Sequence, residues 1–358
     1  MPITLADIAR ELGVSKMTVS RAINNHPAIN PETRRRVLAV ALRMKYQPNQ
    51  HARALVTSRS YLLGMVVPDL MHSYYAEILR GVEAVARPAR FQILICNTDE
   101  ESAREISEVE ALRYRTDGLI IASSLPPAQS QPYQRMLKDG AKIVLIDRVL
   151  ENLRCPAVTT DNIQVGRLAT GHLIIRGHRR IGHLRGSEGS VANDRLEGYR
   201  QALAEHGLKY DQRLVRKCGF LENQGYEAMR DWLADGNVPE AVFVANDPAA
   251  IGAMHALTEA GWRVGTDIAI AGAGCIHHGD MLSVPLTTVA WSTMEMGQQA
   301  ARMLIRLING ETLDKAGQRV IVPPGLVVRR TSGADAGSES VFGRGEIPGQ
   351  LLTPGLEA

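Results

Sequence analysis

Residues 4–25 read TLADIARELGVSKMTVSRAINN, and this stretch predicts two short helices joined by a tight turn. Thr4 can cap the first helix, and Asp7 places a carboxylate near the positive end of that helix. Gly13 can supply the turn with a positive φ, and Ser15 can cap the second helix. The first helix has one apolar face, because apolar residues recur every three or four positions at Leu5, Ile8, Ala9 and Leu12.

The second predicted helix turns Val19 and Ile23 inward and has a short polar and basic outer face. Such a helix fits the major groove of DNA, where its N-terminal end can approach phosphates and base edges. A helical hairpin inside a larger helical domain would have the same spacing, so the spacing alone leaves both interpretations open. The outward residues are Ser15, Lys16, Met17, Ser20 and Arg21.

The residue types narrow the choice, since the stretch reads T-L-x-D-I-A and then G-V-S-x-x-T-V-S-R-x-x-N. This order resembles the DNA-binding head of the lactose-repressor/galactose-repressor (LacI) family of transcriptional regulators. The resemblance extends to about Arg330 through VFVANDPAAIGAMHALTEAGWRVGTDIAIAGAG and PLTTV. It implies a DNA-binding repressor and not an enzyme, with double-stranded DNA as its partner and no cofactor.

The composition restricts the class of protein. The chain has 358 residues, of which 45% are hydrophobic, enough for more than one globular domain and a large core. Its 4 cysteines are scattered without a C-x-x-C pair, so we expect neither a zinc site nor a disulfide scaffold. Neither a signal segment nor a membrane-spanning apolar run is present. We therefore expect a cytoplasmic protein with no membrane partner.

Charge is concentrated at one end of the chain. Residues 1–60 hold 10 basic against 3 acidic residues, a formal net charge of +7, and the remainder carries −4. A basic head on a mildly acidic body suggests a polyanionic partner at one end only. Two such heads on a homodimer should read a pseudo-palindromic operator.

A third helix completes the predicted helix-turn-helix domain, residues 1–47. Asn30-Pro31-Glu32 is a typical helix start, with a cap, a proline at the first helical position and an acid. We expect the arginines at 34–36 to form a solvated face. The apolar face of this helix is Val37, Val40, Ala41 and Met44.

Residues 48–60 are predicted to form a hinge helix and linker. Pro48 stops the third helix, and Asn49 can cap a short helix after it. The family has the same P-N-x-x-A-R-x-L segment as a hinge helix that folds on specific DNA. The resemblance implies that Leu55 wedges into the minor groove and that Ala52 allows a close approach. The alternative is that Leu55 only anchors a linker.

From Tyr61 onward, apolar runs alternate with helical patterns, which is typical of a doubly wound α/β fold with parallel sheets. The pattern restarts after Thr160, so we expect two similar lobes, and the resemblance implies the form of periplasmic sugar-binding proteins. The tail, residues 332–358, is rich in Gly and Pro and is expected to be disordered, and its lack of a leucine heptad favours a dimer. The boundaries predicted for the effector-binding and dimerisation domain are 61–331, with one lobe at 61–160 plus 291–322 and the other at 161–290 plus 323–331.

The resemblance assigns DNA-binding roles within the head. Lys16 and Met17 lie where the family varies to choose operators, and Arg21 follows the shared T-V-S. Arginine and lysine can read guanine, whereas methionine offers only apolar contact, for example to a thymine methyl. Phosphate contacts position the head without reading sequence. Three hydroxyl residues are expected to hold phosphates or to cap helices, namely Ser15, Thr18 and Ser20.

A small sugar-like effector is expected in the cleft between the lobes, where strand ends meet. Asp147, Arg195 and Asn246 match effector residues of the family, and the arginine can hold hydroxyls or a carboxylate in a fork. Asp247 can instead cap the helix that follows it. Each residue taken singly can also serve a structural hydrogen bond or core packing. The cleft walls of relatives correspond to Tyr74, Tyr75 and Phe220.

One departure from the family concerns residues 272–275, which read GAGC where relatives commonly have G-Y-D-D. The acid that would accept from ligand hydroxyls is missing, and Trp291 also differs from the usual residue. Gly274 and Trp291 complete the predicted effector site. With an acid lost and Arg195 retained, we hypothesise an anionic ligand such as a sugar acid or sugar phosphate.

Three other functions fit the sequence less well. A sugar-binding transport protein would need a signal peptide and no basic head. A nucleotide-using α/β enzyme would need a phosphate loop or a catalytic motif, and neither G-x-x-x-x-G-K-[ST] nor G-x-S-x-G occurs. A nucleoid-type binder with an empty cleft would bind DNA in a salt-sensitive manner, without sequence preference or ligand response.

Overall fold

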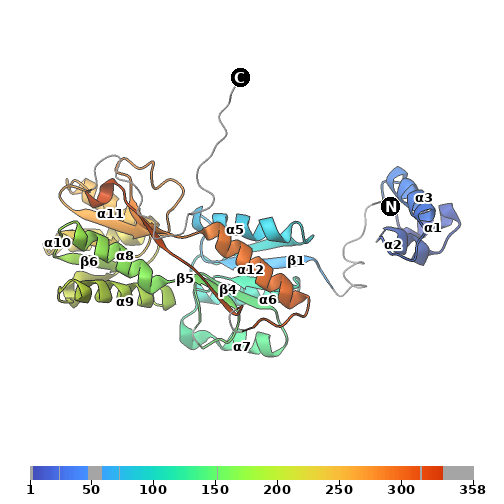
Figure 1. The fold of residues 1–358 in the computed structure, drawn as a ribbon, viewed down its shortest axis with the longest axis horizontal. Coiled ribbons are helices and arrows are strands. Elements are labelled where there is room, and N and C mark those ends of the chain that lie inside the picture. The colour runs from blue at the N-terminus through green and yellow to red at the C-terminus, as the bar shows by residue number, and fades with distance from the viewer. Residues whose placement is uncertain are drawn as a thin grey trace, which may run out of the picture. The chain divides into compact units, whose positions relative to one another are not determined.

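The computed structural model describes residues 3–23, 25–46, 59–71, 73–150, 152–314 and 317–333. Contacts divide the chain into two compact units, residues 1–60 and 61–358, and each is described by itself. Figure 1 shows helices in the first unit and two α/β lobes in the second. The residues predicted to act in the hinge lie outside the described residues, namely Asn49, Ala52 and Leu55.

The described part of the first unit, up to residue 46, holds three helices: α1 (Leu5–Leu12), α2 (Lys16–Ile23) and α3 (Pro31–Arg43). Ile8, Val19 and Val37, one from each helix, are buried together in the core of this unit. Each of these residues belongs to an apolar face that the spacing predicts. The all-helical head is therefore confirmed.

The predicted helix starts are confirmed by hydrogen bonds. The backbone N–H of Thr4 donates to the Asp7 carboxylate at 3.0 Å. Ser15 Oγ accepts from the N–H of Thr18 at 3.0 Å, and Asn30 Oδ1 accepts from that of Thr33 at 2.7 Å. The turn after α1 uses Gly13 at φ 63°, in the left-handed region that favours glycine.

The first lobe of the second unit, called lobe N, is built on a six-stranded sheet. Its order is β11-β5-β4-β3-β1-β2, and all neighbours are parallel. The strands are β1 (Leu62–Val67), β2 (Gln92–Asn97), β3 (Gly118–Ile121), β4 (Ile143–Ile146), β5 (Ala157–Thr160) and β11 (Arg319–Val322). The helices are α5 (Ser73–Ala86), α6 (Ser102–Arg113), α7 (Gln131–Lys138) and α12 (Thr293–Ile308), with a short turn η1 (Pro127–Gln129).

The second lobe, called lobe C, has a sheet in the corresponding order β12-β10-β9-β8-β6-β7. Its strands are β6 (Ile181–Arg185), β7 (Val215–Lys217), β8 (Ala241–Val244), β9 (Ala269–Ala273), β10 (Thr287–Ala290) and β12 (Gly325–Val327). Its helices are α8 (Asn162–Ile175), α9 (Ser190–Glu205), α10 (Glu222–Ala234) and α11 (Asp247–Glu259), with the short turns η2 (Gln212–Leu214) and η3 (Arg330–Ser332).

Both sheets are covered on two faces, as the doubly wound prediction requires. Along β1, Met65 shares a core with α5 and α12, whereas the adjacent Val66 shares one with α6 and α7. Met65 lies opposite Ile95 of β2 and Ile120 of β3. In lobe C, α8 and α9 lie over one face and α10 and α11 over the other. The two-lobed fold is therefore confirmed.

One edge strand differs from the parallel prediction, because β12 runs antiparallel to β10. The chain passes between the lobes three times, from β5 to α8, from β10 to α12 and from β11 to β12. Only Pro323 and Pro324 separate β11 from β12. A strand that runs parallel to the one before it in the same sheet needs a crossover connection. No such connection precedes β12, because β12 enters its sheet directly from β11 of the other lobe.

Two helix pairs cross at reciprocal glycines. A Cβ atom on Gly166 of α8 would overlap the carbonyl oxygen of Arg195 in α9, and one on Gly198 of α9 would overlap the backbone of α8. In lobe N, Gly81 of α5 and Gly297 of α12 meet in the same way. These glycines thus allow the backbones of α8 and α9, and those of α5 and α12, to approach each other closely.

The C-terminal segment is ordered beyond the predicted limit. Ser332 is buried, and its Oγ lies 2.8 Å from both His172 Nε2 and Thr287 Oγ1. The prediction of disorder is therefore wrong for Ser332 and Gly333, and the rest of the tail lies outside the described residues. In the described part of the chain, no helix has the length and apolar character needed to cross a membrane.

Candidate functional site

The outer face of α2 is basic and open. Lys16 and Arg21 are exposed and form no ion pair with any described residue, and Met17 between them is 62% exposed. Thr18 and Ser20 are half-buried on the same helix. Ser15 is exposed, and its Oγ caps α2 and lies 2.9 Å from Thr18 Oγ1. The face can therefore present two cations and one apolar side chain to a partner.

The other cations of the head are partly engaged. Arg43 pairs with Glu11, and Arg10 lies 3.2 Å from the Asp7 carboxylate. Arg34 was predicted to lie on a solvated face with its two neighbours, and that is wrong. It is half-buried, and its Nη2 donates to the carbonyl oxygen of His26 at 2.9 Å, so it holds the loop before α3.

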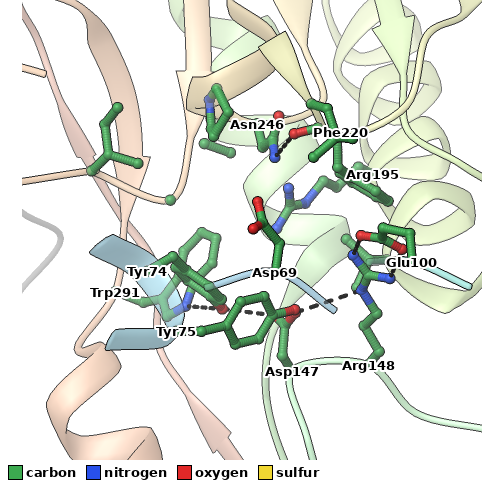
Figure 2. Close-up of a pocket in the computed structure, with 16 residues that line it drawn as sticks. Asp69, Tyr74, Tyr75, Glu100, Asp147, Arg148, Arg195, Phe220, Asn246 and Trp291 are labelled. Carbon is green, nitrogen blue, oxygen red and sulfur yellow. Dashed lines mark hydrogen bonds and ion pairs between the residues drawn. The ribbon is translucent and has the colours of Figure 1, made fainter. Parts of the chain in front are cut away.

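In the second unit, the carboxyl ends of the two sheets face one pocket, shown in Figure 2. It is a partly open pocket lined by charged, polar and aromatic side chains, the kind of lining that small-molecule sites have. Strands of both lobes end at this pocket. All eight residues predicted to bind the effector line it, namely Tyr74, Tyr75, Asp147, Arg195, Phe220, Asn246, Gly274 and Trp291.

A hydrogen-bonded group forms the lobe N side of the pocket. Asp147 follows β4 with φ 64°, and its carboxylate accepts from the hydroxyls of Tyr74 at 2.7 Å and Tyr75 at 2.9 Å. Trp291 Nε1 donates to the Tyr74 hydroxyl at 3.2 Å. Burial, followed by the charge of Asp147, raises the pKa of both tyrosines well above the usual value. They therefore remain hydrogen-bond donors.

Three charged residues of this side were missed by the sequence prediction. Arg148 donates to both carboxylate oxygens of Glu100, at 2.7 and 2.6 Å, and its Nε lies 3.9 Å from Asp147. Burial acts to raise the pKa of Glu100, but the bonds and charge of Arg148 outweigh it and the pKa is lowered. Asp69, which follows β1, is half-buried and points into the pocket (Figure 2). All three residues come shortly after the end of a strand, and this position was the signal in the sequence that could have identified them.

Arg195 of α9 is the buried cation on the lobe C side, with 4% exposure. Its Nε donates to Asn162 Oδ1 at 2.9 Å, and its Nη1 donates to the carbonyl oxygen of Ala245. The guanidinium carbon lies 5.3 Å from the centre of the Trp291 ring. Burial lowers its pKa, although an arginine remains charged at neutral pH. Within the described chain its Nη2 makes no hydrogen bond, so a donor is left for a ligand.

The helix α11 is capped by Asn246 and not by Asp247. Asn246 caps α11, because its Oδ1 accepts from the N–H of Ala249 at 3.1 Å, and its Nδ2 donates to the carbonyl oxygen of Phe220 at 2.8 Å. Asp247 is fully buried and accepts from Thr288 Oγ1 at 2.7 Å and from the N–H of Ile276 at 3.0 Å. The expectation that Asp247 caps the helix is therefore wrong.

The loop after β9 has the small residue Gly274 where the family resemblance led us to expect an acid. Gly274 has φ 119°, and a Cβ atom there would meet only Tyr74, at 3.9 Å. Asp247 holds this loop through Ile276. Among the described residues that line the pocket, three are acids, Asp69, Glu100 and Asp147, and two are arginines.

Metal binding has no evident location. No group of three His, Cys, Asp or Glu in the described ranges could hold a metal ion. His277 and His278 lie in the loop after β9, outside regular structure.

Comparisons with known proteins agree with this architecture. Residues 4–49 match the family described as "Bacterial regulatory proteins, lacI family", and residues 170–332 match "Periplasmic binding protein-like domain". The HTH-type transcriptional regulator DegA of Bacillus subtilis (strain 168) is 34% identical over 336 residues, covering 93% of this chain and 98% of that protein. The ribose operon repressor of Halalkalibacterium halodurans is 32% identical, covering 94% and 99%.

Two solved structures are similar over most of the chain. The Lac repressor dimer bound to operator and the anti-inducer ONPF has a TM-score of 0.82 and 28% identity, covering 93% of this chain and 100% of that one. The transcriptional regulator CelR–cellobiose complex has a TM-score of 0.69 and 32% identity, covering 92% and 99%. This chain therefore belongs to the lacI family of bacterial regulatory proteins, which are DNA-binding transcriptional regulators.

Proposed function

We propose that this protein is a cytoplasmic repressor that binds a pseudo-palindromic operator as a homodimer, under the control of a small sugar-like effector. The observation that carries the control is the pocket, because it takes side chains from both lobes. A ligand held by both lobes favours one arrangement of them over another, and it can shift an equilibrium only through such a difference.

On DNA, α2 would lie in the major groove. Lys16 and Arg21 are exposed and can reach guanine or phosphate, and Met17 can contact a thymine methyl. Leu55 would wedge into the minor groove, with Asn49 and Ala52 supporting the hinge. The hydroxyls assigned to phosphate contact or capping are Ser15, Thr18 and Ser20.

In the pocket, a sugar offers hydroxyls and an apolar ring face. Arg195 has a donor left for a hydroxyl, and the carboxylate of Asp147 offers acceptor oxygens. Phe220 and Trp291 provide aromatic surface beside them. CelR, a relative of similar fold, was solved with cellobiose.

The effector would act on DNA through the arrangement of the lobes. Closing or twisting the lobes would change the spacing of the two hinge segments of a dimer. The coupling free energy between two such sites is typically about 1–3 kcal/mol, which changes operator affinity roughly 5- to 150-fold.

A sugar acid is the second candidate for the effector. Two observations favour it: the donor left on Arg195 and the missing acid at Gly274. The acids of the pocket outnumber its arginines by one, so a carboxylate would have to bind directly at Arg195. Neutral hexoses and aldonic acids can be compared by their effect on the Tm. Stabilisation by hexoses alone would reject the acid.

The main experiment selects operator sequences from random duplex DNA with the purified protein and repeats the binding with candidate sugars. We expect a two-fold-related consensus and a ligand-dependent change in affinity, whose sign tells release from promotion. Salt-sensitive binding without a consensus would favour the nucleoid-type alternative. Leu55→Ala should lose operator specificity more than non-specific affinity, and equal loss of both would contradict the wedge.

A further inference from the structure

A second, partly open cavity lies beside the pocket. We call it the outer compartment. Four residues line both spaces and form what we call the divider, namely Glu100, Arg148, Val191 and Phe220. The sequence analysis predicted a role for only one of these four residues, Phe220.

The lobe N half of the divider is held rigidly. The Arg148 side chain is 14% exposed and is bound at both ends of its fork by Glu100, with a further bond to Ser124 Oγ at 3.0 Å. Ser124 Oγ also donates to Glu100 at 2.9 Å. A bidentate arginine–carboxylate pair fixes geometry as well as charge. Arg148 therefore has little freedom to move aside.

The lobe C half is Phe220, whose ring centre lies 4.8 Å from the guanidinium carbon of Arg148. Its backbone is held on both sides, since the N–H donates to Gln224 Oε1 at 2.9 Å and the carbonyl accepts from Asn246. The ring lies so close to Gly186 that a Cβ atom there would overlap it. Arg148 and Phe220 thus meet across the cleft, each fixed within its own lobe.

The outer compartment has both polar and apolar walls, of which the polar part is the larger. It is lined by Glu188, Gly189 and serine hydroxyls, and one of these, Ser190 Oγ, accepts from the N–H of Val149 at 3.2 Å. Such walls suit a hydroxyl-bearing group, for instance a second sugar ring, better than an apolar one. The serines are Ser123, Ser124, Ser187 and Ser190.

We propose that the Arg148–Phe220 contact restricts the effector to a single sugar ring, by closing the pocket against the outer compartment. This rests on the proposed function, because it names the size class of the ligand of that same site. A disaccharide with one ring in the pocket needs the space that the divider fills, and a steric block of this kind is an effective way to reject a larger competitor. Removing the Arg148 side chain joins the two spaces.

The test compares two double variants, E100Q/R148A and E100Q/R148M. Both lack the ion pair, and the glutamine avoids leaving a buried unpaired carboxylate. Only the alanine variant opens the divider, because methionine retains a long side chain over Phe220. Binding of D-glucose against cellobiose, and of D-galactose against lactose, is measured by calorimetry on the full-length protein. Crystal structures of both variants show whether the cavities have merged.

We expect the wild type to bind a hexose at least about tenfold more tightly than the matching disaccharide, and E100Q/R148A to gain at least about tenfold in disaccharide affinity over E100Q/R148M. Equal binding of a hexose and its disaccharide to the wild type, or equal disaccharide affinity of the two variants, would overturn the inference and leave the proposed function standing. Separate cavities in E100Q/R148A would also overturn it. If none of the four sugars binds the wild type, the inference fails, and the proposed function is then decided by the operator selection and the comparison with aldonic acids.

Discussion

The two lobes share a strand order but present different chemistry to the pocket. On lobe N, the acids Glu100 and Asp147 are already engaged by partners of the same lobe. On lobe C, Arg195 is anchored by Asn162 and by a backbone carbonyl, yet one donor remains open. Lobe N thus meets a ligand with a preformed group whose acceptor capacity is already partly used, and lobe C provides the charge that a ligand can still satisfy. The predictions below test this division.

The largest effect is expected for Arg195→Met. Losing a buried, hydrogen-bonded charge partner of a ligand costs about 2–5 kcal/mol, so effector affinity should fall roughly 30- to 5,000-fold. Operator affinity without effector should change little. Titration of the effector identified in the screen measures this. The matched control is Arg167→Met on the neighbouring helix α8. Arg167 forms an ion pair with Glu205 at 2.8 Å, and neither residue lines the pocket. A similar loss in both variants would contradict the assignment.

The close packing of α9 against α8 can be tested by substituting glycines of α8. Gly166→Ala would push a methyl group against the backbone of Arg195 and should lower the free energy of unfolding by about 3 kcal/mol. Gly171 lies in the same helix, and its nearest neighbour would be 3.9 Å from an added Cβ. Gly171→Ala should therefore stabilise by roughly 0.5–1 kcal/mol. Urea unfolding measures both, and equal destabilisation would mean that the crossing is looser than described.

Acid should weaken lobe C more than lobe N, because His183, which is buried, and His172, which is half-buried, lie in lobe C. Burial lowers the pKa of His172 and His183 from 6.5 to about 4. Between these values the unfolded chain binds protons that the folded protein does not, so stability is full above pH 6.5 and falls as the pH drops toward 4. At pH 5 the loss is about 2 kcal/mol per histidine.

Urea unfolding of the wild type and of His183→Phe at pH 7.5 and pH 5 measures this loss. Burial raises the pKa of Asp247 and Glu105, which acts in the opposite direction, so the informative quantity is the difference between the two proteins. The phenylalanine variant should lose less stability on acidification than the wild type. Identical pH dependence would show that His183 does not stay neutral in the folded state.

The features that the sequence predicted correctly depend on interactions between residues that are close in the chain. Thr4, Ser15 and Asn30 cap their helices through partners three residues away, so residue identity and spacing were sufficient. Strands read as apolar runs, and five of the eight predicted pocket residues follow strand ends. The direction of β12 could not be read this way, because it depends on which sheet receives the strand after Pro324.

The missed parts of the site depend on contacts distant in the chain. Arg148 and Glu100 are 48 residues apart, and each alone resembles an ordinary surface charge. Asn246 and Asp247 are both good caps, and the choice between them was made by Thr288, 41 residues from Asp247. The roles of the hinge residues stay predictions, since residues 47–58 lie outside the described chain.

The smallest effect is expected for Tyr75→Phe, which removes one of the two tyrosine donors to Asp147. Arg148 and water in the pocket can partly compensate, so the loss of stability should be about 1 kcal/mol. Effector affinity should change little, because the preformed group of lobe N keeps its shape. Tyr226→Phe is the control, since that hydroxyl donates to Glu259 at the surface and should contribute almost nothing. If Tyr75→Phe reduced effector affinity as strongly as Arg195→Met, lobe N would contribute as much to ligand binding as lobe C, and the division between the lobes would be wrong.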